Sequence, residues 1–124
     1  MKITTFNPLI LSPKADDIIK FFEELGFVRR HKKDNIDGQD ISSIRMTDTN
    51  GFHVDVGSSN DIDQDLMAIR MNVDDFDEAY DFLTEQGFTN VLDRIVDTGS
   101  SKLAIMQSPS GFVFDLCQHI KDHD

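Results

Sequence analysis

Residues 22–27 read Phe-Glu-Glu-Leu-Gly-Phe, and residues 83–88 repeat the pattern as Leu-Thr-Glu-Gln-Gly-Phe. The two glycines lie 61 residues apart (87 minus 26). Further along, Gly-Phe-His-Val-Asp-Val at 51–56 matches Gly-Phe-Val-Phe-Asp-Leu at 111–116 with an offset of 60 residues (111 minus 51). One such match is uninformative alone, but two matches in register across half of the chain indicate an internal duplication.

The stretches 22–27 and 83–88 each lie at the end of a predicted amphipathic helix. From residue 14 to 25 the apolar side chains recur at helical spacing, while lysine and glutamate fall largely on the other side. We expect Ser12 to cap this helix and Gly26 to end it in a left-handed conformation. A second helix follows an Asp-Phe-Asp-Glu capping box at 75–78 and runs to Gly87.

Strand-like runs surround both helices in the same order. One run precedes each helix and three follow it, separated by turn residues. The runs are 3–11, 27–33, 40–47 and 52–57 around the first helix, and 66–73, 88–95, 102–107 and 112–119 around the second. The sequence predicts an α+β fold of tandem β-α-β-β-β modules at 1–57 and 66–120, joined by a polar linker at 58–65. Because neither half has enough apolar surface to be stable alone, we expect a single domain over 1–124.

Charge and hydropathy exclude several classes of partner. Twelve basic against 23 acidic residues give a formal charge of −11, which opposes binding to nucleic acid and to anionic membranes. No apolar run approaches the roughly 20 residues of a membrane span, and the first residues lack the apolar core of a signal peptide. We therefore expect a cytoplasmic protein that binds neither nucleic acid nor a membrane.

The repeated module resembles the vicinal oxygen chelate superfamily, because its first helix ends in Leu-Gly-Phe and its last strands begin Gly-Phe-x-x-Asp. That group includes glyoxalase I, bleomycin-resistance proteins, fosfomycin-resistance enzymes and extradiol dioxygenases. The resemblance covers nearly the whole chain and is strongest at residues 109–116. It implies a curved mixed sheet around a cleft that binds a small molecule. Together with the open edges of such sheets, it also favours a homodimer.

The resemblance also implies positions for metal ligands. Enzymes of the family hold a divalent metal with a His on the first strand and a Glu on the last strand of each module. The corresponding residues here are Asn7 and Ala68 on the first strands, and Asp55 and Asp115 on the last. His53 lies two residues before Asp55, so it shares a strand face with Asp55 and is a further candidate ligand. The alternative is that His53 is an ordinary strand residue bonded to a neighbour.

Strand alternation selects candidate ligand-binding residues. In the run 66–73, Arg70 and Asn72 share one face and the larger apolar residues the other, which should pack on the helix. Arg70 and Asn72 would then point into the cleft, with Asn7 and Leu9 on its other side. Arg70 either grips a carboxylate or phosphate of the ligand or only neutralises one of the two aspartates.

The sequence leaves the register of the sheets open. In the first module, Ile44 and Met46 alternate with Arg45 and Thr47, and residues 103–106 of the second module alternate in the same way. A shift of one residue exchanges the two faces of a strand. Either set is therefore compatible with the cleft.

Three functions are compatible with the sequence. The first is a protein of the bleomycin-resistance type that binds a small molecule without a cofactor, which the loss of both first-strand histidines favours. The second is a divalent-metal-dependent lyase or isomerase with a weakly held metal on Asp55 and Asp115. The third is a regulatory or interaction protein that uses the modules as a scaffold. Nucleophilic and nucleotide motifs are missing, and Cys117 lies in an apolar run where a buried inert thiol is expected.

Overall fold

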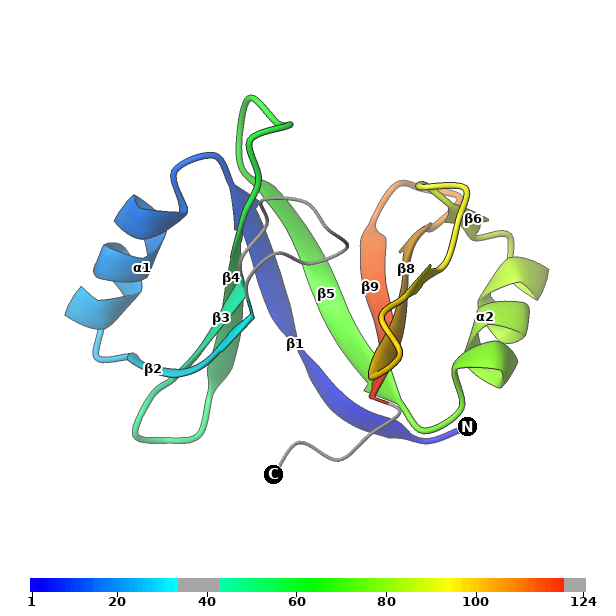
Figure 1. Ribbon diagram of the computed structural model, residues 1–124, viewed down its shortest axis with the longest axis horizontal. Coiled ribbons are helices and arrows are strands. Elements are labelled where there is room, and N and C mark those ends of the chain that lie inside the picture. Colours follow the sequence, from blue (N-terminus) through cyan, green and yellow to red (C-terminus); the bar gives the residue numbers. More distant parts are fainter. Residues whose placement is uncertain (34–42, 120–124) are drawn as a thin grey trace. The chain divides into compact units, whose positions relative to one another are not determined.

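The computed structural model describes residues 1–33 and 43–119 and confirms the predicted α+β fold of tandem modules (Figure 1). The first half contains β1 (Ile3–Ser12), α1 (Ala15–Glu24), β2 (Val28–Lys33), β3 (Ser43–Thr47) and β4 (His53–Ser58). The second half contains β5 (Leu66–Val73), α2 (Phe76–Glu85), β6 (Thr89–Asn90), β7 (Val96–Asp97), β8 (Ser101–Gln107) and β9 (Val113–His119). The start of the predicted strand 40–47 and the end of the second module at residue 120 lie outside the described residues.

The chain forms two compact units whose limits differ from the sequence modules. One unit, here called the α1 unit, comprises residues 7–67, and the other, the α2 unit, comprises residues 1–6 and the chain from Ala68 on. Hydrogen bonds tie the first six residues to the segment that joins β5 to α2. Lys2 N donates to Asp74 Oδ1 at 2.6 Å, and Asp74 N donates to Lys2 O at 3.0 Å.

In the α1 unit, strands follow the order β2-β3-β4-β1. β1 and β4 are parallel, and β2, β3 and β4 are antiparallel neighbours. The amphipathic helix α1 packs its apolar stripe against β3 and β4. Its core consists of Ala15, Ile19, Ile44, Met46, Val54 and Val56.

In the α2 unit, strands follow the order β5-β9-β8-β6, and β7 also pairs with β8. β5 and β9 are parallel, while β9, β8 and β6 are antiparallel neighbours. The apolar face of β5 packs on the helix, as alternation predicted. The core consists of Met71, Val73, Phe76, Ala79, Leu83, Ala104, Met106 and Leu116.

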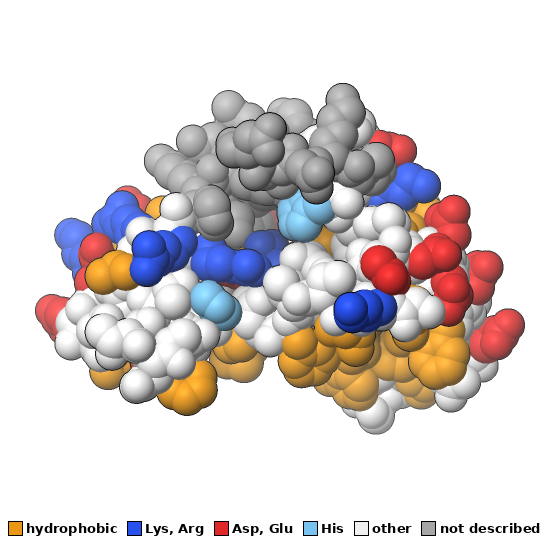
Figure 2. Space-filling view, turned by 90° about the horizontal axis from the view of Figure 1, so that it is seen from below, with side chains coloured by type: hydrophobic (Ala, Val, Ile, Leu, Met, Phe, Trp, Pro, Cys, Tyr) orange, Lys and Arg blue, Asp and Glu red, His pale blue; other side chains and the backbone are white. Residues whose placement is uncertain are grey.

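An aromatic cluster extends the core of the α2 unit to the surface. Phe88 stacks on Phe114 with ring centroids 5.7 Å apart, and Phe112 contacts both rings edge-on. Phe6 meets Phe114 edge-on at 6.4 Å. Phe6 and Phe112 are more than half exposed, and Figure 2 shows hydrophobic side chains gathered over this unit.

The two helices begin differently. Asp75 caps α2 as predicted, since its Oδ1 accepts from Glu78 N at 3.1 Å. The prediction of Ser12 as the cap of α1 is wrong, because β1 continues through Ser12 and Lys14 occupies the cap position. The Ser12 hydroxyl instead accepts from Lys14 N and donates to Asp65 Oδ1 in the linker. Neither helix in the described part of the chain is long and apolar enough to cross a membrane.

The predicted strand 88–95 is present only at its start. Thr89–Asn90 forms a strand that pairs with β8, Val91 N still donates to Ile105 O at 2.8 Å, and the chain then turns. The Asn90 side chain accepts from Leu92 N at 3.1 Å and donates to Arg94 O at 3.0 Å, and Asp93 has a φ of 56°. These side-chain bonds compete with strand pairing for the backbone groups.

Candidate functional site

The two cores decide which side chains point away from the helix of each unit. We call that side of the strands the helix-free face. In β3, Ile44 and Met46 belong to the core under α1, so alternation places Arg45 on the helix-free face. In β8, Ala104 and Met106 belong to the core under α2, so the odd-numbered residues of β8 lie on the helix-free face. This settles the register that the sequence left open.

The helix-free face of the α1 unit carries a buried ion pair. Asp55 is fully buried, and its register partners are Leu9 on β1 and Arg45 on β3. Arg45 Nε donates to Asp55 Oδ1 at 2.9 Å, and Nη2 donates to Oδ2 at 3.1 Å, so the pair is bidentate. Arg45 Nη2 also lies 3.2 Å from Asn7 Oδ1, and Asn7 Nδ2 donates to the Pro8 carbonyl. Asn7 and Leu9, predicted to line a ligand site, are nearly buried here, and Asn7 supports Arg45.

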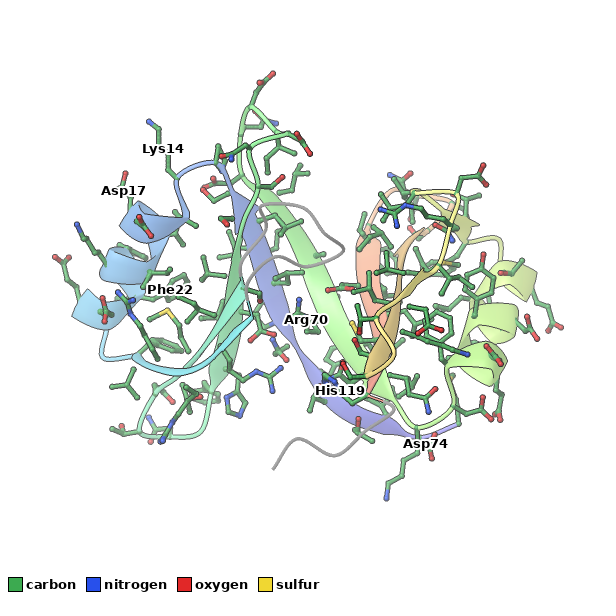
Figure 3. The ribbon with its side chains drawn as sticks, viewed as in Figure 1. Lys14, Asp17, Phe22, Arg70, Asp74 and His119 are labelled. Carbon is green, nitrogen blue, oxygen red and sulfur yellow. The ribbon has the colours of Figure 1, made fainter. Side chains whose placement is uncertain are left out.

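The helix-free face of the α2 unit carries a second ion pair. Asp115 is 3% exposed, and its register partners are Arg70 on β5 and Ile105 on β8. Arg70 Nε and Nη2 donate to Asp115 Oδ2 at 3.1 and 3.0 Å. Arg70 is labelled in Figure 3. The thiol of buried Cys117 donates to Asp115 Oδ1 at 3.2 Å. Of the two roles considered for Arg70, the structure shows the neutralisation of an aspartate.

The duplicated modules neutralise their aspartates from opposite sides. In the α1 unit the guanidinium comes from β3 and the aliphatic neighbour from β1. In the α2 unit the guanidinium comes from β5, the equivalent of β1, and the aliphatic neighbour from β8. Each aspartate is therefore flanked by one arginine and one aliphatic side chain, with the two strands exchanged.

Sequence reasoning did not select Arg45 as a site residue. The Asn50-Gly51 turn signal is the feature that points to it, because a hairpin centred there brings residue 45 opposite residue 55. The loop covers 48–52, and Asp48 Oδ1 closes it by accepting from Asn50 N and Phe52 N at 2.9 Å.

The donor groups at the predicted metal positions do not fit a divalent metal ion as they are arranged. Both Asp55 oxygens accept from a guanidinium, and Asp115 accepts from a guanidinium and a thiol. His53 is exposed, and its Nδ1 lies 2.8 Å from Thr47 Oγ1. Within residues 1–33 and 43–119, no three His, Cys, Asp or Glu side chains are grouped to hold a metal. A metal on His53, Asp55 and Asp115 stays a prediction.

Two buried polar atoms on the α2 unit lack a hydrogen-bond partner in the described part of the chain: Thr5 Oγ1 and Asn72 Oδ1. Asn72 is 4% exposed and alternates with the core residue Met71, so it lies on the helix-free face. Phe6 contacts Phe114, which packs against the core under α2, so Thr5 lies on the helix-free face as well. Each unpaired buried group costs about 1–3 kcal/mol.

A cavity of about 590 Å³ lies at the start of α1. Its lining includes the first turn of α1, where Lys14 and Asp17 are labelled in Figure 3, and Arg29 of β2. Ile44 and Val56, which also line it, belong to the core under α1. The cavity is therefore on the helix side of the α1 unit, and no sequence pattern predicted it.

The described geometry is that of a known fold. The structure of methylmalonyl-CoA epimerase from Mycobacterium tuberculosis is similar, with a TM-score of 0.72, 17% identity, and coverage of 96% of this chain and 90% of that one. A variant of the Streptomyces coelicolor epimerase in complex with 2-nitronate-propionyl-CoA has a TM-score of 0.71 and 14% identity, covering 99% of each chain. A glyoxalase I mutant from Zea mays has a TM-score of 0.68 and 14% identity, covering 98% of this chain and 45% of that one.

At these identities the similarity shows the fold alone. No curated protein sequence matches the chain closely enough to count as a relative. The sequence itself matches a family model over residues 5–116, which include both ion pairs. The chain therefore belongs to the glyoxalase/bleomycin resistance protein/dioxygenase superfamily.

Proposed function

We propose that this protein binds a small molecule on the helix-free face of the α2 unit and does so without a divalent metal. The observation that carries the proposal is the pairing of both aspartates with arginine. These aspartates occupy the positions at which the family resemblance implies metal ligands, and a guanidinium supplies the positive charge there instead.

The burial of the aspartates supports a metal-free site. A metal that replaced Arg45 at Asp55 would leave a guanidinium without its partner carboxylate. Removing one member of a buried ion pair costs about 3–5 kcal/mol, which a metal would have to supply before any net binding. The Arg70–Asp115 pair, with side-chain exposures of 19% and 4%, imposes the same kind of cost.

The comparisons support a small molecule as the partner without identifying it. The Streptomyces coelicolor epimerase is described in complex with a coenzyme A derivative, and the family description includes bleomycin resistance proteins. We keep Arg70 and Asn72 as ligand-binding residues and assign Asn7 and Leu9 to the support of Arg45 and Asp55. The cleft between modules, the homodimer and the cytoplasmic location stay predictions.

A metal-dependent lyase or isomerase is the alternative. The observation that favours it is that both last-strand positions keep a carboxylate on the helix-free face of their unit. In that case His53 or water would have to complete the coordination sphere, since zinc, nickel and iron sites generally need at least about three protein donors.

Metal titration separates the two functions. We expect no stoichiometric metal in the purified protein and no saturable calorimetric binding of nickel, zinc, manganese or iron(II) below about millimolar concentration. Asp115→Ala is the matched control. Stoichiometric binding that disappears in Asp115→Ala contradicts the metal-free proposal. Saturable binding of propionyl-CoA or metal-free bleomycin in the presence of a chelator supports it.

A further inference from the structure

The helix-free face of the α2 unit has unmet hydrogen-bonding capacity beside a satisfied ion pair. Asn72 Oδ1 and Thr5 Oγ1 are buried and have no partner in the described part of the chain, whereas Asp115 accepts from Arg70 and Cys117. Buried polar groups of native proteins are nearly always paired, so an unpaired one calls for an explanation. Two of them on one face of one unit point to a partner from outside the chain.

We infer that this face binds the polar head of an uncharged small molecule that carries a hydrogen-bond donor, such as a primary carboxamide. The Asn72 side chain accepts from the donor of the ligand, and the Thr5 hydroxyl bonds to a second polar atom. A carboxamide suits Asn72 in particular, because it offers a donor and an acceptor on one group and so complements an amide side chain in either orientation. This inference rests on the proposed small-molecule binding function and specifies the class of ligand.

The neighbouring ion pair explains why the head is uncharged. A carboxylate ligand would compete with Asp115 for Arg70, and an amine would compete with Arg70 for Asp115. Either ligand would leave a charge without its partner in a site where both carboxylate and guanidinium are largely buried. An uncharged ligand keeps the ion pair intact, lies beside Arg70 without displacing Asp115, and bonds to the two atoms that lack a partner.

The same face supplies an apolar surface for the rest of the ligand. Leu103 and Ile105 lie on it, half-buried, with Cys117 and Asp115 as their register partners. Ligand sites commonly combine apolar walls with a few polar groups that fix orientation. We therefore expect a ligand in which the donor-bearing head is attached to a ring or short chain.

Three small aromatic probes of similar size test which charge of the head group the site accepts. Benzamide, benzoate and benzylamine share a ring and differ in being neutral, anionic and cationic. Each is titrated into the ¹⁵N-labelled full chain while the Asn72 side-chain NH₂ and the backbone amides of 70–72 are followed by NMR. We expect saturable shifts with benzamide in the millimolar range usual for so small a ligand. Benzoate and benzylamine should bind at least about fivefold more weakly.

Substitutions then assign the contact. Asn72→Leu and Thr5→Val, each close in size to the native residue, should weaken benzamide binding by about fivefold while leaving the unfolding midpoint equal or higher. Thr89→Val, at an exposed position of β6, is the matched control and should change neither benzamide binding nor the unfolding midpoint. A purely structural role for Asn72 would instead lower the midpoint and leave benzamide binding unchanged.

The inference is overturned if benzamide binds Asn72→Leu as well as it binds the native chain, or if none of the probes gives saturable shifts. Tighter binding of benzoate or benzylamine at residues 70–72 also overturns it, but leaves the small-molecule function standing. Stoichiometric metal binding would contradict the proposed metal-free function but would leave the inferred contact at Asn72 standing.

Discussion

Arg45 and Asp55 form a largely buried ion pair, with side-chain exposures of 23% and 1%. Such a pair adds little net stability over apolar residues, but the loss of one partner leaves a buried charge uncompensated. The cost is greater here because Arg45 also bonds to Asn7. At the scale of the single residue, we therefore expect the stability of the α1 unit to depend strongly on Arg45.

Arg45→Met should lower the free energy of unfolding by about 3–5 kcal/mol, because methionine retains bulk but leaves Asp55 without a counter-charge. Urea denaturation followed by circular dichroism measures the change. Arg29→Met is the control, since the Arg29–Glu23 pair is exposed, with side-chain exposures of 53% and 41%, and its loss should cost under about 1 kcal/mol. Equal effects of both substitutions would contradict the importance of the buried pair.

The exchange of strands around the aspartates belongs to the scale of the element. β1 and β5 are equivalent, as are β3 and β8, yet arginine sits on β3 in one module and on β5 in the other. In both modules the position beside the aspartate needs one guanidinium, and either neighbouring strand is close enough to supply it. In the duplicated fold, the arginine of this ion pair can therefore come from the strand on either side of the aspartate.

Arg70→Leu should destabilise the protein by up to about 3–5 kcal/mol, and adding Ile105→Arg should restore most of the loss. The reason is that residue 105 lies opposite Asp115 just as residue 45 lies opposite Asp55. Leu103→Arg in the Arg70→Leu background is the matched control, because residue 103 lies opposite Cys117. Equal rescue by both arginines, measured as unfolding midpoints, would show a general charge effect and not an exchange of strands.

At the scale of the whole molecule, acidic residues greatly outnumber basic ones. The chain carries 23 acidic and 12 basic residues, and several acids lie on α2, where Figure 2 shows acidic side chains on that side of the molecule. A net charge far from zero keeps a protein in solution, but repulsion between the like charges destabilises the folded state. Salt screens this repulsion between exposed charges.

Raising sodium chloride from about 10 to about 200 mM should therefore raise the thermal unfolding midpoint, because the Debye length falls below the spacing of many surface charges. Differential scanning calorimetry measures the shift. A variant with the exposed α2 acids neutralised, Asp81→Asn with Glu85→Gln, should have a smaller salt response. A midpoint that falls with salt would mean that attractive surface pairs outweigh the net repulsion.

The sequence by itself determined the duplication, the two helices, most of the strands and the family. These features depend on local periodicity, on capping such as that by Asp75, and on turn residues, all of which act over a few neighbouring positions. The failures at Ser12 and at residues 88–95 are local too, but there a side chain bonds the backbone in a way that composition does not reveal.

Only the tertiary structure decided which partner each polar side chain meets. Arg70 and Asp115 are 45 residues apart, and the pairing of β5 with β9 brings them together. Arg45 became a site residue because the core under α1 takes Ile44 and Met46, which turns the intervening side chain toward Asp55. The unpaired oxygen of Asn72 is likewise a property of the packed strands. Periodicity assigns a residue to a face, but the neighbours on that face come from strands distant in sequence, and their register is set by the packing of the cores.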